Sequence, residues 1–315
     1  MALDIAVVMD PIETIHVTKD STFAMLLEAA RRGHRLHYVR PGSLGLRQGS
    51  PVAEIAELEV FDRSEGHFRL GRYQAAPLAG LDLVLMRRDP PVDRDYLHDT
   101  QILSMARAEG VRVVNDPQGL RDLNEKLAAL RFPELCPATL VSRDAAALRA
   151  FVDEHGECVL KPLDGMGGRS IFRTRRGDPN LGVIIETLSA GGSERVMAQE
   201  YLPAIEQGDK RVLLVDGEPA PFCLARIPQG GDFRGNLAAG GRGEARPLSA
   251  SDRAIAAAVG PVMRQLGMRF VGLDVIGDRL TEINVTSPTC IREIAAQTGF
   301  DVAAMLLDRL ESDCA

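Results

Sequence analysis

The hydrophobic and polar positions in the first third of the chain alternate between the patterns of strands and helices. Two segments, at residues 21–32 and 95–109, have apolar side chains at helical spacing. Ser21 or Thr22 is expected to cap the first of these helices, and Gly33 to end it. Apolar runs of strand length lie at residues 3–9, 35–39, 81–86 and 111–114. Because strands separated by helices form parallel βαβ units, the pattern predicts an open α/β domain that ends near residue 120.

Within this domain, residues 41–79 are polar and irregular with few strong signals, and the pattern changes after about residue 120. Residues 211–215 and 218–227 flank Asp216-Gly217, which is a strong signal for a β-hairpin. A second hairpin is expected where residues 270–276 and 280–285 flank a short polar turn. Helices are expected at about 144–155, 252–266 and 289–296. Antiparallel hairpins combined with helices predict an α+β organisation for this part of the chain.

Composition narrows the class of protein. The 315 residues are 45% hydrophobic and 26% charged, which is ordinary for globular domains, and the length allows two or three of them. A net charge of −7 gives no bulk attraction to nucleic acid or an anionic membrane, and the absence of Trp argues against base stacking. The apolar run at the amino terminus is too short for a signal peptide, and no stretch is long enough to span a membrane. The five widely spaced cysteines are typical of reduced thiols in a cytoplasmic protein.

Glycine is over-represented, with 30 residues against a usual share of about 7%, and it is densest at residues 227–243. This segment holds six glycines together with Arg234 and Arg242. Backbone N–H groups in such a loop can approach an anion without obstruction by Cβ atoms. The segment is therefore interpreted as a lid that closes over a labile phosphate, with a disordered surface loop as the alternative.

A second cluster, Gly165, Gly167 and Gly168, follows a strand that contains Lys161. It resembles a phosphate cradle, although it has no Gly-Lys-Ser/Thr and is not a Walker A loop. An ordinary β-turn is the alternative for the glycines, and a side chain that extends from the strand end to solvent is the alternative for Lys161. Lys126, in a helical-looking segment, is uninformative by itself.

Oxygen ligands for a metal ion are expected in the second hairpin. Glu282 and Asn284 share one face of their strand, and carboxylate and amide oxygens together with phosphate oxygens suit Mg²⁺. A three-residue loop at 277–279 would pair Asp274 with Glu282, whereas a two-residue loop would place Glu282 on the opposite face. We predict the three-residue loop, with a solvated polar face as the alternative to a metal site.

Cations lie in the first hairpin. Asp209-Lys210-Arg211 leads into one strand, and Arg226 ends the other. With a two-residue turn, Arg211 is expected opposite residue 222. Cations, glycine-rich loops and paired oxygen ligands within one α+β region indicate Mg-nucleotide chemistry with a transferred phosphoryl group. No plausible Ser-His-Asp or Cys-His constellation competes with this interpretation.

Several longer motifs resemble the bacterial glutathione synthetase family of the ATP-grasp superfamily, and the similarity covers essentially the whole chain. The motifs are VVMDP near the start, LMRRDPP at 85–91, LKPLDGMGGRSIF at 160–172, GDKRVLLVDGEP at 208–219, LARIPQGGDFRGNLAAGGRGE at 224–244 and GLDVIGDRLTEINVTSPTCIREI at 272–294. The resemblance implies an ATP-grasp fold with an N-terminal open parallel-sheet, Rossmann-like (pre-ATP-grasp) domain at 1–122. It further implies a central lid subdomain at 123–202, and a C-terminal catalytic subdomain at 203–315 with a flexible glycine-rich loop at 227–243.

The resemblance also implies a reaction. Members ligate γ-L-glutamyl-L-cysteine to glycine with ATP, through an acyl phosphate, and give glutathione, ADP and phosphate. This is the second step of glutathione biosynthesis. ATP and Mg²⁺ are the implied cofactors, with Mn²⁺ as a substitute, and members are commonly homotetramers. Such an enzyme is expected in the cytoplasm, with small-molecule substrates and with neither nucleic acid nor a membrane as partner.

Residue roles follow from the matched motifs. The nucleotide would be held by Lys126 and Lys161 at the α- and β-phosphates, by the glycine cradle Gly165, Gly167 and Gly168, by Gln199, Glu200, Tyr201 and Leu202 at adenine, and by Asp209 at the ribose side with Lys210 beside it. The metal ligands would be Asp274, Glu282 and Asn284. Arg211 and Arg226, with Gly240 and Gly241 of the lid, would be catalytic.

Substrate contacts are expected from the ends of the N-terminal strands, because open α/β sheets bind ligands there. The residues are Asp10, Lys19, Arg87 and Asp89. Ser287, Pro288 and Thr289 would present a helix N-terminus to a carboxylate, since proline suits the first helical turn.

Other functions remain as alternatives. A sister ATP-grasp ligase, such as a D-alanine–D-alanine ligase or a glutamate ligase, would share the ATP residues, but VVMDP, LMRRDPP and the lid sequence favour the glutathione synthetases. A nucleotide-binding protein without catalysis would lack a metal ligand or the lid. A dinucleotide oxidoreductase would need G-x-G-x-x-G after the first strand, where this chain has Met9-Asp10-Pro11-Ile12.

Overall fold

The computed structural model describes residues 2–231, 233–237 and 240–313. Its N-terminal part contains the predicted parallel sheet, in the order β2-β1-β7-β8. The strands are β1 (Asp4–Val8), β2 (Arg35–Val39), β7 (Leu83–Met86) and β8 (Arg112–Val114). Alternate side chains of β1 face opposite layers: Val8 packs with α2 (Arg94–Ala108), and Val7 with α1 (Ser21–Arg31). The two helices therefore cover the two faces of the sheet, as the alternating strand and helix pattern predicts.

The cap of α1 differs from the expectation. Asp20, and neither Ser21 nor Thr22, is the N-cap residue, and its carboxylate accepts a hydrogen bond of 2.6 Å from the Phe23 backbone N–H. A carboxylate at this position satisfies an orphan N–H and also complements the positive end of the helix dipole.

Residues 41–79 contain strands that the sequence interpretation missed. They are β3 (Gly45–Arg47), β4 (Ser50–Val60), β5 (Phe68–Leu70) and β6 (Gln74–Pro77). β4 pairs antiparallel with β2, and β3, β5 and β6 pair with β4, so the N-terminal sheet is mixed. The alternation of buried Ala56 and Leu58 with exposed Glu57 and Glu59 was the available signal.

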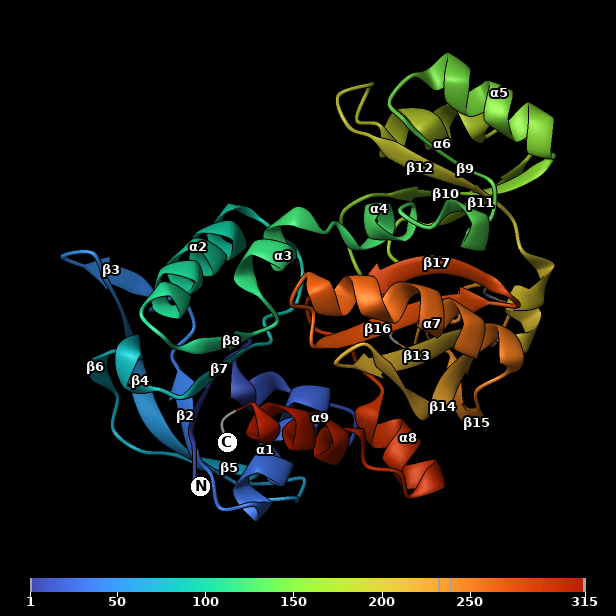
Figure 1. Ribbon diagram of the computed structural model, residues 1–315. Coiled ribbons are helices and arrows are strands. Elements are labelled where there is room, and N and C mark those ends of the chain that lie inside the picture. The colour runs from blue at the N-terminus through green and yellow to red at the C-terminus, as the bar shows by residue number, and fades with distance from the viewer. Residues whose placement is uncertain (1, 232, 238–239, 314–315) are drawn as a thin grey trace.

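The central part has a four-stranded antiparallel sheet in the order β11-β10-β12-β9. The strands are β9 (Thr139–Ser142), β10 (Glu157–Pro162), β11 (Phe172–Arg175) and β12 (Val196–Glu200). α5 (Ala145–His155) and α6 (Leu181–Leu188) cover one face, and the unit stands apart at the upper right of Figure 1. Leu160 packs under these helices. Lys161, the next residue of β10, therefore faces the opposite side.

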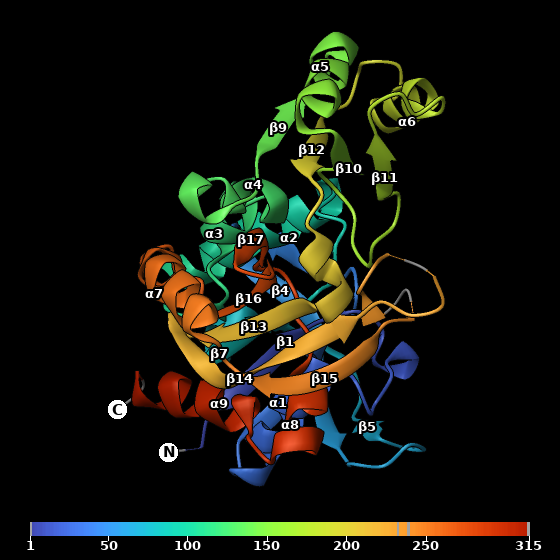
Figure 2. The ribbon, with the colours of Figure 1, turned by 90° about the vertical axis from the view of Figure 1, so that its right-hand side faces the viewer.

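The C-terminal part is a five-stranded antiparallel sheet in the order β15-β14-β13-β16-β17. The strands are β13 (Asp209–Val215), β14 (Glu218–Ile227), β15 (Arg242–Pro247), β16 (Phe270–Ile276) and β17 (Arg279–Asn284). α7 (Ala250–Gln265) packs on one face through residues such as Val259, and α8 (Ile291–Thr298) and α9 (Val302–Ser312) pack on the other. Figure 2 shows α8 and α9 below this sheet, and the β14–β15 loop close to the β10–β11 loop.

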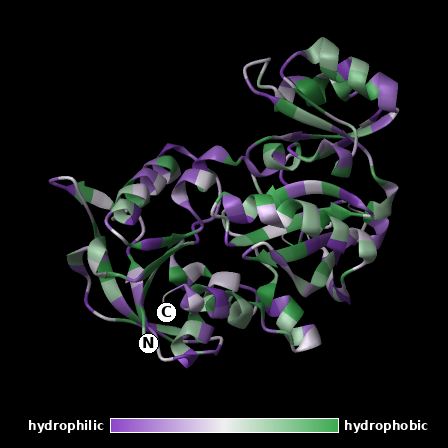
Figure 3. Ribbon diagram, in the orientation of Figure 1, coloured by the Kyte–Doolittle hydropathy of each residue, from purple (hydrophilic) through white to green (hydrophobic). Residues whose placement is uncertain are grey.

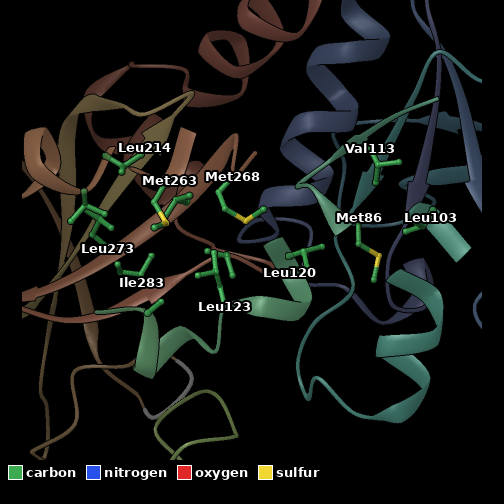
Figure 4. Packing of buried hydrophobic residues seen from close by; sticks show 14 of the residues in the cluster. Met86, Leu103, Val113, Leu120, Leu123, Leu214, Met263, Met268, Leu273 and Ile283 are labelled. Atoms are coloured by element: carbon green, nitrogen blue, oxygen red, sulfur yellow. The ribbon is translucent and has the colours of Figure 1, made fainter. Parts of the chain in front are cut away.

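The N- and C-terminal parts share their cores. α9 packs against α1, so the end of the chain returns to the N-terminal part. On the other side, Leu120 of α3 (Pro117–Asp122) lies between Met86 of the N-terminal sheet and Met268, which precedes β16, and Leu123 belongs to the same cluster (Figure 4). In Figure 3 the hydrophobic residues are concentrated along the central strands. The predicted boundaries at 122 and 203 stay a prediction, and the central unit is the part with a core of its own.

Short elements complete the described chain. α4 (Glu125–Ala129) follows α3, and the 3₁₀ turns are Ile12–Thr14, Leu78–Gly80, Pro133–Leu135 and Pro203–Gln207. Within residues 2–231, 233–237 and 240–313, no helix has the length and apolarity needed to cross a bilayer. Cys136, Cys158, Cys223 and Cys290 are buried free thiols, and Cys314 lies outside the described residues.

Candidate active site

A cavity of about 320 Å³ lies between the central unit and the C-terminal sheet. Most of the residues selected from the sequence line it, although they come from segments far apart in the chain. These are Asp89, Lys126, Lys161, Gly165, Gly167, Gly168, Gln199, Glu200, Tyr201, Leu202, Asp209, Arg211, Arg226, Asp274, Glu282, Asn284, Ser287 and Thr289. The role of each remains a prediction.

Two lysines, Lys126 and Lys161, line the cavity. The Lys126 ammonium lies 3.2 Å from the Glu282 Oε1 atom and donates to the Gly165 carbonyl, also at 3.2 Å. Lys161 is buried on the inner face of β10. Burial lowers the pKa of Lys161, because the charged ammonium loses solvation, and the carboxylate of Glu282 opposes this effect. A polyphosphate in the cavity would restore the lost stabilisation of both cations.

Two arginines and two aspartates form a buried network of ion pairs on the C-terminal sheet, which forms the floor of the cavity. Arg211 Nε lies 2.6 Å from Asp274 Oδ1, and Arg226 Nη2 lies 2.9 Å from Asp274 Oδ2 and 2.5 Å from Asp209 Oδ2. Burial by itself would raise the pKa of Asp274, but Arg211 and Arg226 outweigh it and hold that pKa well below its usual range. Burial raises the pKa of Asp209 despite Arg226, and the Asp274 carboxylate adds to that increase. The network holds both guanidinium groups rigidly at the cavity.

Strand register changes two expectations in this network. Arg211 pairs with Leu224 and not with residue 222, because a bulge between Val212 and Leu214 shifts the register. Lys210 does not line the cavity: its ammonium donates to Asp252 of α7 and to the Gly277 carbonyl at 2.8 Å. Successive side chains of β13 point to opposite faces of the sheet, so Lys210 cannot face the cavity together with its neighbours Asp209 and Arg211.

The predicted metal ligands lie close together, but the loop between their strands differs from the predicted one. Asp274 pairs with Glu282, as predicted, but the loop is Gly277-Asp278 and not the three-residue loop. A β-bulge after Asp274 supplies the extra residue that a longer loop would have supplied.

The converged side chains offer an all-oxygen donor set. Asn284 donates through Nδ2 to the Gly272 carbonyl at 3.2 Å, which leaves its Oδ1 atom as an acceptor. Two carboxylates and one amide oxygen suit a hard divalent cation that keeps phosphate and water ligands. Among the described residues, no group of three or more His, Cys, Asp or Glu side chains is arranged to hold a metal ion.

The glycine-rich loop is shorter than predicted and meets the glycine cradle. β15 begins at Arg242, so this residue and Gly243 belong to a strand. Residues 233–237 line the cavity, and Arg234 Nη1 donates to the Gly168 carbonyl at 2.9 Å. Gly240 and Gly241 are outside the cavity lining, and positions 232 and 238–239 of the predicted lid lie outside the described residues.

The N-terminal residues are divided between several places. Asp89 lines the main cavity, where burial raises its pKa and a hydrogen bond from Ser287 opposes that increase. Asp10 accepts a 2.8 Å hydrogen bond from the Asp89 backbone N–H and lines a smaller hollow of about 150 Å³. Lys19 is exposed and lines neither hollow.

Arg87 is buried and joins two domains instead of lining the cavity. Its guanidinium donates to Thr22 Oγ1 at 3.1 Å and to the Pro288 carbonyl at 2.9 Å. Burial lowers its pKa to about 10. The expected helix N-terminus at residues 287–289 is wrong, because α8 begins at Ile291 and Cys290 is its N-cap residue, with φ of 93°. Pro288 therefore precedes the helix.

Sequence reasoning missed Glu125, Thr286 and Cys290, which also line the cavity. Glu125 precedes Lys126 in the chain, and its carboxylate is bound by the backbone of residues 285 and 286. The sequence signal was its place next to a predicted ligand, but only the fold brings residues 160 positions apart into contact.

Comparisons with known proteins agree with this geometry. The model of the prokaryotic glutathione synthetase N-terminal domain matches residues 3–121, and the model of the prokaryotic glutathione synthetase ATP-grasp domain matches residues 125–299. The chain belongs to the prokaryotic glutathione synthetase family. A glutathione synthetase of Xanthomonas axonopodis pv. citri is 64% identical over 315 residues, with all of both chains covered. One from Escherichia coli K12 is 57% identical over 310 residues, 98% of each chain.

Solved structures show the same fold at low sequence identity. The ATP-grasp ligase PsnB, in a complex with a precursor variant, Mg and ADP, is 21% identical with a TM-score of 0.62, over 100% of this chain and 99% of that one. D-cycloserine synthetase DcsG is 17% identical with a TM-score of 0.66, over 98% and 99%. The fold is therefore ATP-grasp, and the family membership makes this protein an ATP-dependent ligase that works with a divalent metal.

Proposed function

We propose that this member of the family is a glutathione synthetase that ligates γ-L-glutamyl-L-cysteine to glycine, with ATP converted to ADP and phosphate. The observation that carries the proposal is the single cavity into which Lys126, Lys161, Arg211 and Arg226 converge opposite the oxygen ligands of β16 and β17. Family members that are named glutathione synthetase and match the whole chain support this choice over a sister ATP-grasp ligase.

The chain's residues would act mainly by binding and orientation. Lys126 and Lys161 neutralise the phosphates, while residues 199–202 at the end of β12 bind adenine and Asp209 lies toward the ribose. Arg211 and Arg226 stabilise the charge that develops on the transferred phosphoryl group and on the acyl phosphate that glycine's amine then attacks. Their ion pairs with Asp274 hold them in place before substrate arrives, so little reorganisation is needed.

Asp274, Glu282 and Asn284 would hold the divalent cation. Mg²⁺, with Mn²⁺ as a substitute, supplies neutralisation of the phosphate charge when bound. Asp274 can serve a cation and the arginines together, because a carboxylate has about four lone-pair sites.

Water exclusion is the second task of the chain. Residues 233–237 and the glycine cradle meet across the cavity through Arg234 and Gly168. A closed contact here protects an acyl phosphate from hydrolysis. Asp89 and Ser287 line the same cavity, and in this proposal they would contact the dipeptide. A cytoplasmic location and a homotetrameric assembly belong to the proposal as properties of the family.

Omission of substrates tests the proposal. We expect phosphate release to require ATP, Mg²⁺, γ-glutamylcysteine and glycine together, with glutathione formed in equal amount. Release that does not depend on γ-glutamylcysteine would favour a sister ligase. Glu282→Gln should lower turnover by about 10²-fold or more, because it replaces a charged cation ligand by a neutral one and removes the ion-pair partner of Lys126. Replacement of Mg²⁺ by Mn²⁺ should retain activity.

A further inference from the structure

The first turn of α4 contacts two of the segments that line the cavity, the glycine cradle of the central unit and the end of β17. Asn124 donates through Nδ2 to the Leu163 carbonyl at 3.3 Å, at the start of the glycine cradle. Lys126 reaches both Gly165 and Glu282. Between them, Glu125 reaches the corner that follows β17. Three successive residues thus join the central unit to the strand that carries the predicted metal ligands.

Glu125 makes the most extensive of these contacts through a single oxygen. Its Oε1 atom accepts hydrogen bonds from the Val285 N–H at 2.8 Å, the Thr286 N–H at 3.0 Å and the Thr286 Oγ1 hydroxyl at 2.8 Å. Val285 directly follows Asn284, the last of the predicted metal ligands. Because three donors from two successive residues converge on this one oxygen, the side chain clamps the backbone at this corner.

Capping of α4 does not explain why Glu125 makes these hydrogen bonds. Asn124 is the N-cap residue of this helix, and its Oδ1 atom already accepts from the backbone N–H groups of Lys126 and Leu127. Glu125 is therefore not required as a cap, and its side chain crosses to a segment 160 positions away. Its contribution is to the relative placement of α4 and the end of β17.

We propose that Glu125 is a positioning residue, which holds the Lys126 ammonium and the Glu282–Asn284 ligand strand in the arrangement that a metal–nucleotide complex needs. This inference rests on the proposed function for the identity of the reaction, whereas the positioning role of Glu125 is inferred from the geometry of the cavity. Residues behind metal ligands typically change metal affinity or activity by about 10–100-fold when removed. Displacement by about 1 Å at the reacting groups is enough for losses of this size.

The experiment tests whether the length or the charge of the Glu125 side chain is required. Glu125→Gln keeps the length and the Oε1 acceptor but loses the charge, whereas Glu125→Asp keeps the charge but is one methylene too short to hold the corner. With ADP present, Mn²⁺ is titrated into each variant, and free aqueous Mn²⁺ is measured by electron paramagnetic resonance. We expect Glu125→Asp to bind Mn²⁺ about 10-fold or more weakly and Glu125→Gln to stay within about threefold of the unaltered protein. The same two substitutions at Glu186, which is exposed on α6, are the matched control and should leave binding unchanged.

Turnover and folding are measured on the same samples. Loss of Mn²⁺ affinity in Glu125→Asp with a melting temperature near that of Glu186→Asp supports positioning. Normal Mn²⁺ binding by Glu125→Asp would overturn the inference. A loss of affinity in Glu125→Gln as large as in Glu125→Asp would also overturn it, because Glu125 would then act through its charge or as a metal ligand.

A second variant keeps the test decisive if Glu125→Asp does not fold. Thr286→Val removes one of the three donors to Glu125 and should weaken Mn²⁺ binding about threefold to 10-fold, whereas unchanged binding would count against the clamp. Absence of γ-glutamylcysteine-dependent ligation in the unaltered protein would defeat the proposed function alone, because the Mn²⁺–ADP measurement needs neither substrate.

Discussion

Arg226 and Asp274 form an ion pair of 2.9 Å although their strands are not neighbours, since β13 lies between β14 and β16. The guanidinium spans the intervening strand and also contacts Asp209 on it. One cation therefore links three strands beneath the cavity. This relationship makes the planar shape of arginine, and not only its charge, a requirement at position 226.

Arg226→Lys tests that requirement. Lysine retains the charge but cannot bond to Asp209 and Asp274 in the same geometry, so we expect kcat to fall by about 10²-fold while the dissociation constant for ADP changes by less than about threefold. Steady-state kinetics and calorimetry give the two quantities. Arg246→Lys, at an ion pair with Glu244 on the partly exposed β15, is the matched control and should retain activity. An unchanged kcat in Arg226→Lys would remove the proposed role.

Gly168→Ala tests the contact between the two glycine-rich segments. A Cβ atom at position 168 would lie 2.7 Å from Asn236 Oδ1 and 3.3 Å from Arg234 Cδ, so both side chains would have to shift from their present contact with the cradle. We expect phosphate release to exceed glutathione formation severalfold, because water reaches the acyl phosphate. Gly177→Ala shares the positive φ, 74° against 78°, but its Cβ atom would meet nothing within 4 Å, so it should stay coupled. Equal coupling in the two variants would contradict the water-exclusion role of residues 233–237.

Glu28→Gln tests a pH-dependent contribution to stability outside the active site. Arg31 and Arg32 lower the pKa of the Glu28 carboxyl to about 2, against the opposing effect of burial. A depressed carboxyl pKa stabilises the folded state at pH values above the unfolded pKa, and this contribution is lost as the pH falls through the folded pKa.

The expected difference in the free energy of unfolding between the native chain and Glu28→Gln is about 1–2 kcal/mol at pH 6–7, between the values for exposed and buried charged pairs. It should shrink progressively as the pH falls from about 4.5 toward 2. Urea unfolding at a series of pH values measures it. A difference that stays constant down to pH 2 would show that the charge of Glu28 makes no contribution.

The buried thiols should be inert at neutral pH. Burial raises the pKa values of Cys136, Cys158 and Cys223 to about 11, so only about one thiolate in a thousand exists at pH 8. We expect alkylation by iodoacetamide, followed by mass spectrometry of each peptide, to be at least about 100-fold slower than in guanidinium-unfolded protein. Rapid modification of any of these three in the folded protein would mean that its segment opens readily.

Local signals in the sequence determined much of the framework. The βαβ units of the first third and the Asp216-Gly217 hairpin depend on period and turn chemistry, which neighbouring residues specify. The motifs likewise identified the cations and oxygen ligands that line the cavity. The Asp274–Glu282 pair was predicted correctly, but from a three-residue loop, whereas the structure has a two-residue loop and a bulge.

The tertiary structure alone decided the remaining relationships. The bulges next to Asp274 and Val212 set which residues face each other, and neither follows from the two-residue turn of its hairpin. Strand alternation directs Lys210 to Asp252, and a domain contact buries Arg87 against Pro288. Glu125 meets Thr286 only in the folded chain. Contacts between segments that are distant in the chain are stabilised by burial, and this burial exists only in the folded protein. The sequence pattern therefore predicts which residues belong to the site, but not which partners hold them in place.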